Sequence, residues 1–128
     1  MLNAIDAIFI STSNMDRMIS FYRTLGVPLK VNDHGEGLHA EADFGDLHFA
    51  LQQWKSQDIV RSNISFSFKV PNLEEYCEVL EANGIKFTSR PTPKPFGGVI
   101  AELKDPDGNH LFLNRWQTDE EYKKNFPK

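Results

Sequence analysis

Hydrophobic and polar positions follow a helical spacing in two stretches of this chain, and the two stretches resemble each other. Residues 14–26 and 72–84 each begin with Asn, carry apolar side chains three and four positions apart, and end with Gly; Asn14 and Asn72 are 58 residues apart. Such a stripe forms one buried face of a helix, and Asn and Gly are typical of helix starts and stops. Residues 14–25 are thus expected to form a helix that Asn14 caps and Gly26 ends. The sequence therefore predicts one structural unit that is used twice.

The segments around these helices show the spacing of strands. Residues 38–43 and 47–53 alternate apolar with polar side chains on either side of Phe44-Gly45-Asp46, which predicts a hairpin with one face on a core. Runs of β-branched and aromatic residues predict further strands at 5–11, 28–31, 64–70, 85–88, 99–104 and 110–114, with a turn at 32–37 and a Pro-rich loop at 90–96. The chain is thus expected to form two βαβββ modules.

These modules are expected to make up one α+β domain. Module one covers about residues 1–54, a polar linker about 55–62, and module two about 63–116. Thr118 then precedes two glutamates and, a turn later, two lysines, so a short helix is predicted at 118–126 with Thr118 as its cap.

Composition excludes several classes of function. The 128 residues carry a formal net charge of −4 with no run of Lys or Arg, so nucleic acid is not an expected partner. We find neither a secretory leader nor an apolar stretch of membrane-spanning length, and we expect a cytoplasmic protein with no membrane partner. Cys77, the single cysteine, lies in the apolar stripe of the second helix and is expected to be a buried structural thiol.

Two motifs carry a resemblance to a known family. The turn Lys104-Asp105-Pro106-Asp107-Gly108-Asn109 is followed by His110-Leu111-Phe112-Leu113, and Phe21-Tyr22-Arg23-Thr24-Leu25-Gly26 stands near the start. Together they resemble the glyoxalase, bleomycin-resistance and extradiol-dioxygenase superfamily, also called vicinal oxygen chelate proteins, over nearly the whole chain. The resemblance implies a curved, mostly antiparallel mixed sheet around a cavity. The Pro-Asp-Gly turn itself has a structural explanation, because these residues favour a tight reversal of the chain.

The resemblance also implies where a metal would lie. Enzymes of this family hold a divalent ion at four equivalent strand positions, which carry over to Ala7, Ala50, Ser65 and Phe112. None of these side chains is a usual metal ligand, so we predict no metal and no cofactor. His48 and His110 are the good ligand types nearby, and two interpretations remain open for them: polar residues of a wet pocket wall, or the start of an unrecognised metal site.

Strand alternation predicts which side chains line the cavity. Leu47, Phe49 and Leu51 should face the first helix, and Leu111 and Leu113 the second. The opposite face would then carry the predicted ligand-binding residues, with the two tryptophans at the rim and His39, Glu41 and Asp43 on an adjacent strand. The predicted set is His48, Gln52, Trp54, His110, Phe112, Asn114 and Trp116.

This surface suits a flat, polar or cationic small molecule. Other charged groups have simpler explanations. The carboxylates of the second helix are expected only to face solvent: Glu74, Glu75, Glu78 and Glu81. Arg90 is also expected to face solvent, and the alternative is that it binds an acidic group of the ligand. No Gly-rich phosphate loop or nucleophile elbow is present, so no catalytic residue is predicted.

The sequence favours a metal-free small-molecule binding protein of the bleomycin-resistance type, acting by sequestration or delivery and forming a homodimer. The alternative is a metal-dependent lyase, glutathione or thiol transferase, or dioxygenase of the same superfamily, centred on His48 and His110. A regulatory or protein-interaction module is a third possibility.

Overall fold

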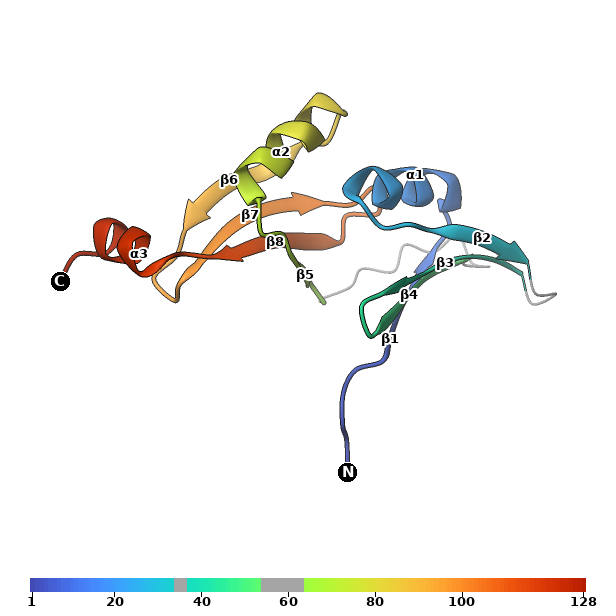
Figure 1. The fold of residues 1–128 in the computed structure, drawn as a ribbon. Helices are drawn as coiled ribbons and strands as arrows, with labels where there is room; N and C mark the ends of the chain where they lie inside the picture. Colours follow the sequence, from blue (N-terminus) through green and yellow to red (C-terminus); the bar gives the residue numbers. More distant parts are fainter. Residues whose placement is uncertain (34–36, 54–63) are drawn as a thin grey trace. The chain divides into compact units, whose positions relative to one another are not determined.

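The structure, a computed structural model, describes residues 1–33, 37–53 and 64–128. Two compact units divide the chain, the first covering residues 1–60 and the second residues 61–128. Each contains a four-stranded mixed sheet and a helix that lies across one face of it (Figure 1). The predicted α+β class and the βαβββ order are confirmed in both units.

The first unit runs through β1 (Ala7–Thr12), α1 (Met15–Leu25), β2 (Lys30–Asp33), β3 (Leu38–Phe44) and β4 (Leu47–Gln53). Its strands are arranged in the order β1-β4-β3-β2. β1 is parallel to β4, whereas the other neighbours are antiparallel. The central position of β4 explains its largely apolar sequence, since both of its edges are paired.

The second unit repeats this plan and adds a helix. It contains β5 (Phe66–Lys69), α2 (Leu73–Ala82), β6 (Phe87–Pro93), β7 (Gly98–Lys104), β8 (His110–Trp116) and α3 (Asp119–Asn125). The strand order is β5-β8-β7-β6, with β5 parallel to β8. β8 is therefore the counterpart of β4, and β7 the counterpart of β3.

The apolar stripes of α1 and α2 form the cores, as predicted. Met18 and Tyr22 of α1 are fully buried, and the Tyr22 ring lies 5.1 Å from that of Phe49 on β4. In α2, Leu73, Cys77 and Leu80 are buried. Burial raises the pKa of the Cys77 thiol to about 11, with the nearby glutamates adding to the effect, so this cysteine is the inert structural thiol expected from its position.

The ends of α1 follow the predicted positions, but one predicted interaction is wrong. Gly26 adopts a left-handed conformation with φ of 118°, and its N–H donates to the carbonyls of Tyr22 and Arg23, which ends the helix. The side chain of Asn14, however, makes no capping hydrogen bond; instead, the Asn14 N–H donates to Oγ1 of the buried Thr12 at 2.9 Å. Asn72 also begins its helix without a side-chain cap.

The predicted Pro-rich loop at 90–96 is partly wrong, because β6 continues through Pro91 to Pro93. Proline lacks an N–H and is tolerated only where the ladder needs no donor. β6 is the edge strand of its sheet, and its pairing with β7 shifts register twice between Phe87 and Thr92. The edge position and these irregularities explain how a segment rich in proline can still form a strand.

The C-terminal helix confirms the cap predicted at Thr118. The Thr118 side chain accepts the Glu121 N–H, and the Glu121 carboxylate accepts the Thr118 N–H in return, which forms a capping box. No residue of α3 is buried. In the described part of the chain, no helix is long and apolar enough to cross a membrane.

Candidate functional site

Strand alternation separates two faces on each sheet. On β4, Phe49 and Leu51 are buried on the side of α1, while His48 and Gln52 are half-buried on the other side. On β8, Leu111 and Leu113 are buried, while His110, Phe112 and Asn114 are half-buried. We call the side away from the helix the polar face of each unit. The side chains predicted to line a site on β4 and β8 lie on these two faces.

Strand register adds the neighbours on the polar face of the first unit. His39, Glu41 and Asp43 of β3 lie directly opposite Gln52, Ala50 and His48 of β4. The expectation that these three residues share the face with β4 is therefore confirmed. Nδ1 of His48 lies 3.0 Å from Oδ1 of Asp43, which makes a hydrogen-bonded pair across the two strands.

An exposed phenylalanine completes this face. Phe9 of β1 lies opposite Ala50, is 59% exposed, and its ring centroid is 6.3 Å from that of His48. Strand alternation predicts this placement, because Phe9 stands two residues after Ala7 and therefore shares its face. The sequence did not identify Phe9 as a ligand-binding residue.

The polar face of the second unit is built around Phe112. The centroids of the Phe112 and His110 rings lie 4.7 Å apart, and the rings are tilted by 32° to each other. Glu102 of β7 lies opposite Phe112, and its Oε1 is 3.2 Å from Nε2 of His110. Glu102 was not predicted from the sequence, although alternation along residues 99–104 places it with Phe112.

Two polar atoms on this face are buried and have no hydrogen-bond partner: Nε2 of His110 and Oδ1 of Asn114. For His110, the 3.2 Å approach of Glu102 is close enough for an electrostatic interaction but does not have hydrogen-bond geometry. Unsatisfied polar atoms of this kind are uncommon in folded proteins, so they identify the strip along β8 as unusual.

An aromatic pair lies at the end of this strip. The rings of Trp116 and Phe96 meet edge to face at 6.1 Å, and both are largely exposed, at 60% and 63%. Gly98 lies opposite Trp116, and a side chain there would come within 2.4 Å of Oδ1 of Asn114 and 2.8 Å of the Phe96 ring. Glycine at position 98 therefore lets the asparagine and the phenylalanine lie over the backbone. Trp54, the other predicted rim residue, lies outside the described residues.

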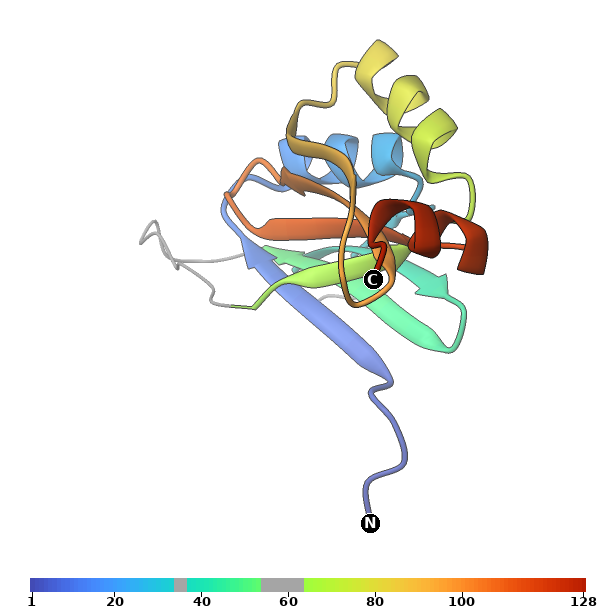
Figure 2. The same cartoon turned by 90° about the vertical axis from the view of Figure 1, so that its left-hand side faces the viewer.

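The segment after Trp116 supports this aromatic pair. The Gln117 side chain donates to the carbonyls of Lys94 and Gly98, and the Tyr122 hydroxyl of α3 donates to the carbonyl of Pro95. Figure 2 shows α3 beside the turn that joins β6 to β7. The C-terminal segment thus fixes the turn that carries Phe96.

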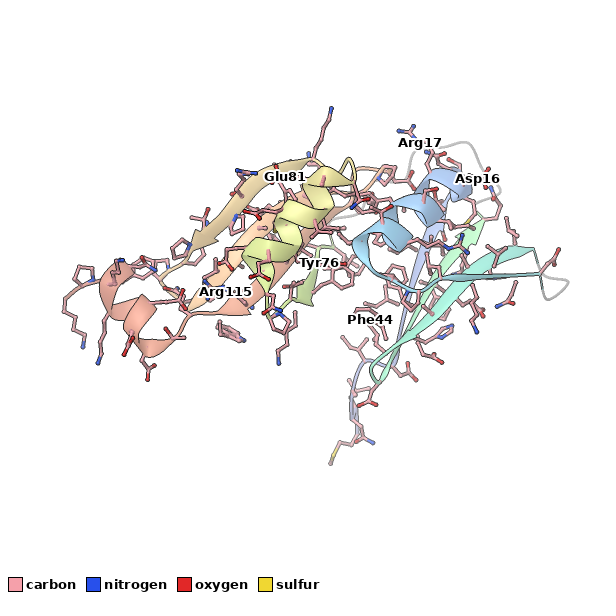
Figure 3. All side chains as sticks on the ribbon, turned by 45° about the horizontal axis from the view of Figure 1, so that its top comes forward. Asp16, Arg17, Phe44, Tyr76, Glu81 and Arg115 are labelled. Carbon is pink, nitrogen blue, oxygen red and sulfur yellow. The ribbon has the colours of Figure 1, made fainter. Side chains whose placement is uncertain are left out.

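Arg115 connects the helices of the second unit to β8 and corrects one prediction. Its guanidinium binds the Glu74 carboxylate, with Nε to Oε1 at 2.8 Å, and the Glu121 carboxylate, with Nη2 to Oε2 at 2.8 Å. Glu74 was expected only to face solvent, but it anchors α2 to β8. Glu81 likewise binds Arg90, so that arginine is already paired with a carboxylate. Figure 3 labels Arg115 on β8 near α2, and Glu81 on α2.

These ion pairs shift the ionisation of the groups involved. The hydrogen bonds from Arg115 lower the pKa of Glu121 to about 2, with help from the Thr118 N–H, and they also lower the pKa of Glu74. The two carboxylates raise the pKa of Arg115 in return. The network is structural, because Arg115 lies on the helix side of β8 and not on the polar face.

The polar faces offer groups for aromatic contact and for hydrogen bonding. Within residues 1–33, 37–53 and 64–128, no group of three or more His, Cys, Asp or Glu side chains is arranged to hold a metal ion. The chemistry on the two faces comes from aromatic rings, imidazoles, carboxylates and amides. Such groups can bind and orient a small molecule.

Comparison with solved structures identifies the fold. A glyoxalase/bleomycin resistance protein/dioxygenase from Nocardioides superposes with a TM-score of 0.75 at 18% identity, covering 93% of this chain and 87% of that one. TioX from Micromonospora sp. ML1 matches with a TM-score of 0.69 at 17% identity, covering 90% and 100% of the two chains. A bleomycin-binding protein in complex with bleomycin matches with a TM-score of 0.66 at 25% identity, covering 91% and 100%.

Sequence comparison gives a family but no individual relative. No curated protein matches the chain. The family model of the Glyoxalase/Bleomycin resistance protein/Dioxygenase superfamily matches residues 4–113, which is most of the sequence and includes both motifs that carried the resemblance. The chain therefore belongs to the glyoxalase/bleomycin resistance protein/dioxygenase superfamily.

Proposed function

We propose that this protein binds a small molecule without a metal, in the manner of the bleomycin-resistance members of its superfamily, and acts by sequestering or delivering that molecule in the cytoplasm. The observation that carries the proposal is the ring contact between Phe112 and His110, 4.7 Å apart and half-buried on the polar face of the second unit. An aromatic wall flanked by a few polar groups is typical of sites that hold a small molecule.

The residues at the family's metal positions support the metal-free part of this proposal. Ala7, Ala50 and Phe112 offer methyl groups and a phenyl ring, and Ser65 offers only a hydroxyl. A divalent ion in such a site needs imidazole, carboxylate or thiolate ligands in a closed shell. The side chains present do not fit such an ion.

Charges of both signs lie on the polar faces. Glu41 and Asp43 lie on the face of the first unit with Lys30, and Glu102 lies on that of the second with Lys69 and Lys104. A flat, cationic or donor-rich molecule would stack on a ring and meet a carboxylate. The structurally similar bleomycin-binding protein was solved with bleomycin bound, which supports antibiotics of that kind as first compounds to test.

The proposal is tested by titrating the protein with bleomycin and with flat cationic aromatic compounds while following tryptophan fluorescence. Phe112→Ala should weaken binding about 2- to 10-fold, since an aromatic contact contributes about 0.5–1.5 kcal/mol beyond its buried area. Phe44→Ala is a matched control, because Phe44 lies on the opposite face of its sheet at the β3–β4 turn. Equal binding by Phe112→Ala and the parent, or no response to any compound, would argue against this site.

The alternative is a metal-dependent lyase, transferase or dioxygenase in which His48 and His110 act as ligands. Elemental analysis of the purified protein separates the two functions. We expect no stoichiometric metal, whereas one equivalent of tightly bound zinc, nickel, manganese or iron that is lost in a His48→Ala/His110→Ala double variant would favour the enzyme.

We also propose that the protein forms a two-fold homodimer with two equivalent sites. The free edges of two four-stranded sheets and exposed apolar residues such as Phe9 and Ile64 would be covered by association. Sedimentation at micromolar concentration should give the mass of a dimer, and a monomer would contradict this part of the proposal.

A further inference from the structure

Each unit carries a carboxylate–histidine pair on its polar face. His48 directly precedes the buried Phe49 of β4, and His110 directly precedes the buried Leu111 of β8, the counterpart strand. In each unit the carboxylate comes from the adjacent antiparallel strand: Asp43 from β3 and Glu102 from β7. The histidines are equivalent but the carboxylates are not, because Asp43 lies directly opposite His48, whereas Glu102 lies opposite Phe112 and reaches His110 diagonally.

The two carboxylates approach different nitrogens of the two rings. Oδ1 of Asp43 lies 3.0 Å from Nδ1 of His48, whereas Oε1 of Glu102 lies 3.2 Å from Nε2 of His110. An ionised carboxylate can only accept, so Asp43 favours the proton on Nδ1 of His48 through a hydrogen bond. Glu102 favours the proton on Nε2 of His110 through its charge alone, because that contact does not have hydrogen-bond geometry. In the neutral ring the other nitrogen then carries a lone pair, which is Nε2 in His48 and Nδ1 in His110.

We propose that Asp43 and Glu102 hold the two histidines in opposite tautomers, and that each ring thereby presents a hydrogen-bond acceptor to a ligand that donates N–H or O–H groups. This inference rests on the proposed binding function and names the ligand class: molecules rich in amine, amide or guanidine donors.

Ligands of the opposite chemistry fit these faces poorly. A phosphate or carboxylate has only acceptors, so it would leave the imidazole lone pairs unmatched, and on the first unit it would also meet the negative charge of Asp43. On the second unit Glu102 shares its face with Lys69 and Lys104, so hydrogen bonding alone discriminates there. The Phe112 ring lies against His110 at an angle of 32° and adds a surface on which a planar donor can lie. The acceptors are therefore combined with an aromatic platform on the second unit.

The tautomers are measured without any ligand by long-range ¹H–¹⁵N correlation of the histidine rings at about pH 9, where a free imidazole is neutral. We expect His48 to carry its proton on Nδ1 and His110 on Nε2. His39 is an internal reference, because its Nδ1 lies 3.0 Å from the carbonyl of Gly37, which can only accept. Asp43→Ala should move the His48 proton to Nε2, the tautomer preferred by a free ring, and leave the His39 signals unchanged. The reverse proton position on His48 or His110 in the parent would overturn the assignment.

The ligand class is tested with two planar probes of similar size, benzamidine, which donates, and benzoate, which accepts. Benzamidine should shift the His48 or His110 ring signals and bind at least about tenfold more tightly than benzoate, the effect of one charge-assisted hydrogen bond. Equal or tighter binding of benzoate, or binding of neither probe, would overturn the donor assignment. Failure of the proposed function would give a different result: Phe112→Ala and the parent would bind bleomycin equally, while both histidines had the expected tautomers.

Discussion

The aspartate that opens the Asp-Pro-Asp-Gly-Asn turn should be a large contributor to stability. Oδ1 of Asp105 accepts the N–H groups of Asp107 at 3.0 Å and Asn109 at 2.8 Å, and Oδ2 accepts the Asn109 side-chain amide at 2.7 Å. Asp105 is only 4% exposed. Gly108 takes the positive φ of 87° that the reversal needs. The family motif therefore builds a turn that positions His110 at the start of β8.

Replacing Asp105 by Ala removes all three of these hydrogen bonds. Each bond to a charged acceptor contributes about 1.5–3 kcal/mol net. Asp107 and Gly108 are exposed, so water replaces part of the lost hydrogen bonding. We therefore count only the two backbone bonds, each at the lower value, and expect a loss of about 3 kcal/mol in the free energy of unfolding. Asp105→Asn keeps an oxygen for the backbone donors but sets its NH₂ against the Asn109 amide, so an intermediate loss of about 1–2 kcal/mol is expected.

Urea unfolding followed by circular dichroism measures these differences in the free energy of unfolding. Asp107→Ala is the matched control in the same turn: its side chain is exposed, and the change should cost less than about 0.5 kcal/mol. A loss below about 1 kcal/mol for Asp105→Ala, or equal losses at positions 105 and 107, would refute the reasoning that the Asp105 carboxylate organises the turn.

Three further predictions concern the core, the ion pairs and the thiol. Leu111→Ala should lower the free energy of unfolding by about 2–5 kcal/mol in urea because Leu111 is fully buried, whereas Val79→Ala, at an exposed position, should change it by less than about 0.5 kcal/mol. The pKa of Glu121 is lowered from 4.5 to about 2 in the folded chain, so its stabilising contribution is complete above pH 4.5 and is lost as the pH falls towards 2. Thermal melts over that range should therefore fall less steeply for Glu121→Gln than for the parent, and parallel curves would contradict the Arg115 pairing. Because burial raises the pKa of Cys77 to about 11, the folded protein should not react with Ellman's reagent at about pH 8, whereas the urea-unfolded chain should react at once.

The sequence predicted those features that depend on periodicity. Alternation in residues 47–53 and 110–114 separated Phe49 and Leu111 from His48 and Phe112, and helical spacing identified the buried stripe of α1. Both signals follow from which face is buried, and burial is the dominant constraint on sequence.

Features that depend on pairing between distant segments were not predictable in the same way. Glu74 and Arg115 are separated by 41 residues, and nothing in the local pattern of α2 distinguishes Glu74 from Glu75. Glu102 became recognisable as a neighbour of His110 only when the β7–β8 register was known. The strand at Pro91–Pro93 was missed because a proline is incompatible with an interior strand, and the sequence does not say which strand lies at an edge.

Each sheet takes its four described strands from one half of the chain, since the orders are β1-β4-β3-β2 and β5-β8-β7-β6. Two copies of the chain can therefore exchange a whole unit without breaking any strand pair within either sheet. Such a domain-swapped assembly would contain the same backbone hydrogen bonds in its sheets as the unexchanged chain, and protein concentration would shift the balance between the two. In a chain built this way, the described strand pairing of each half does not depend on which copy supplies the other half.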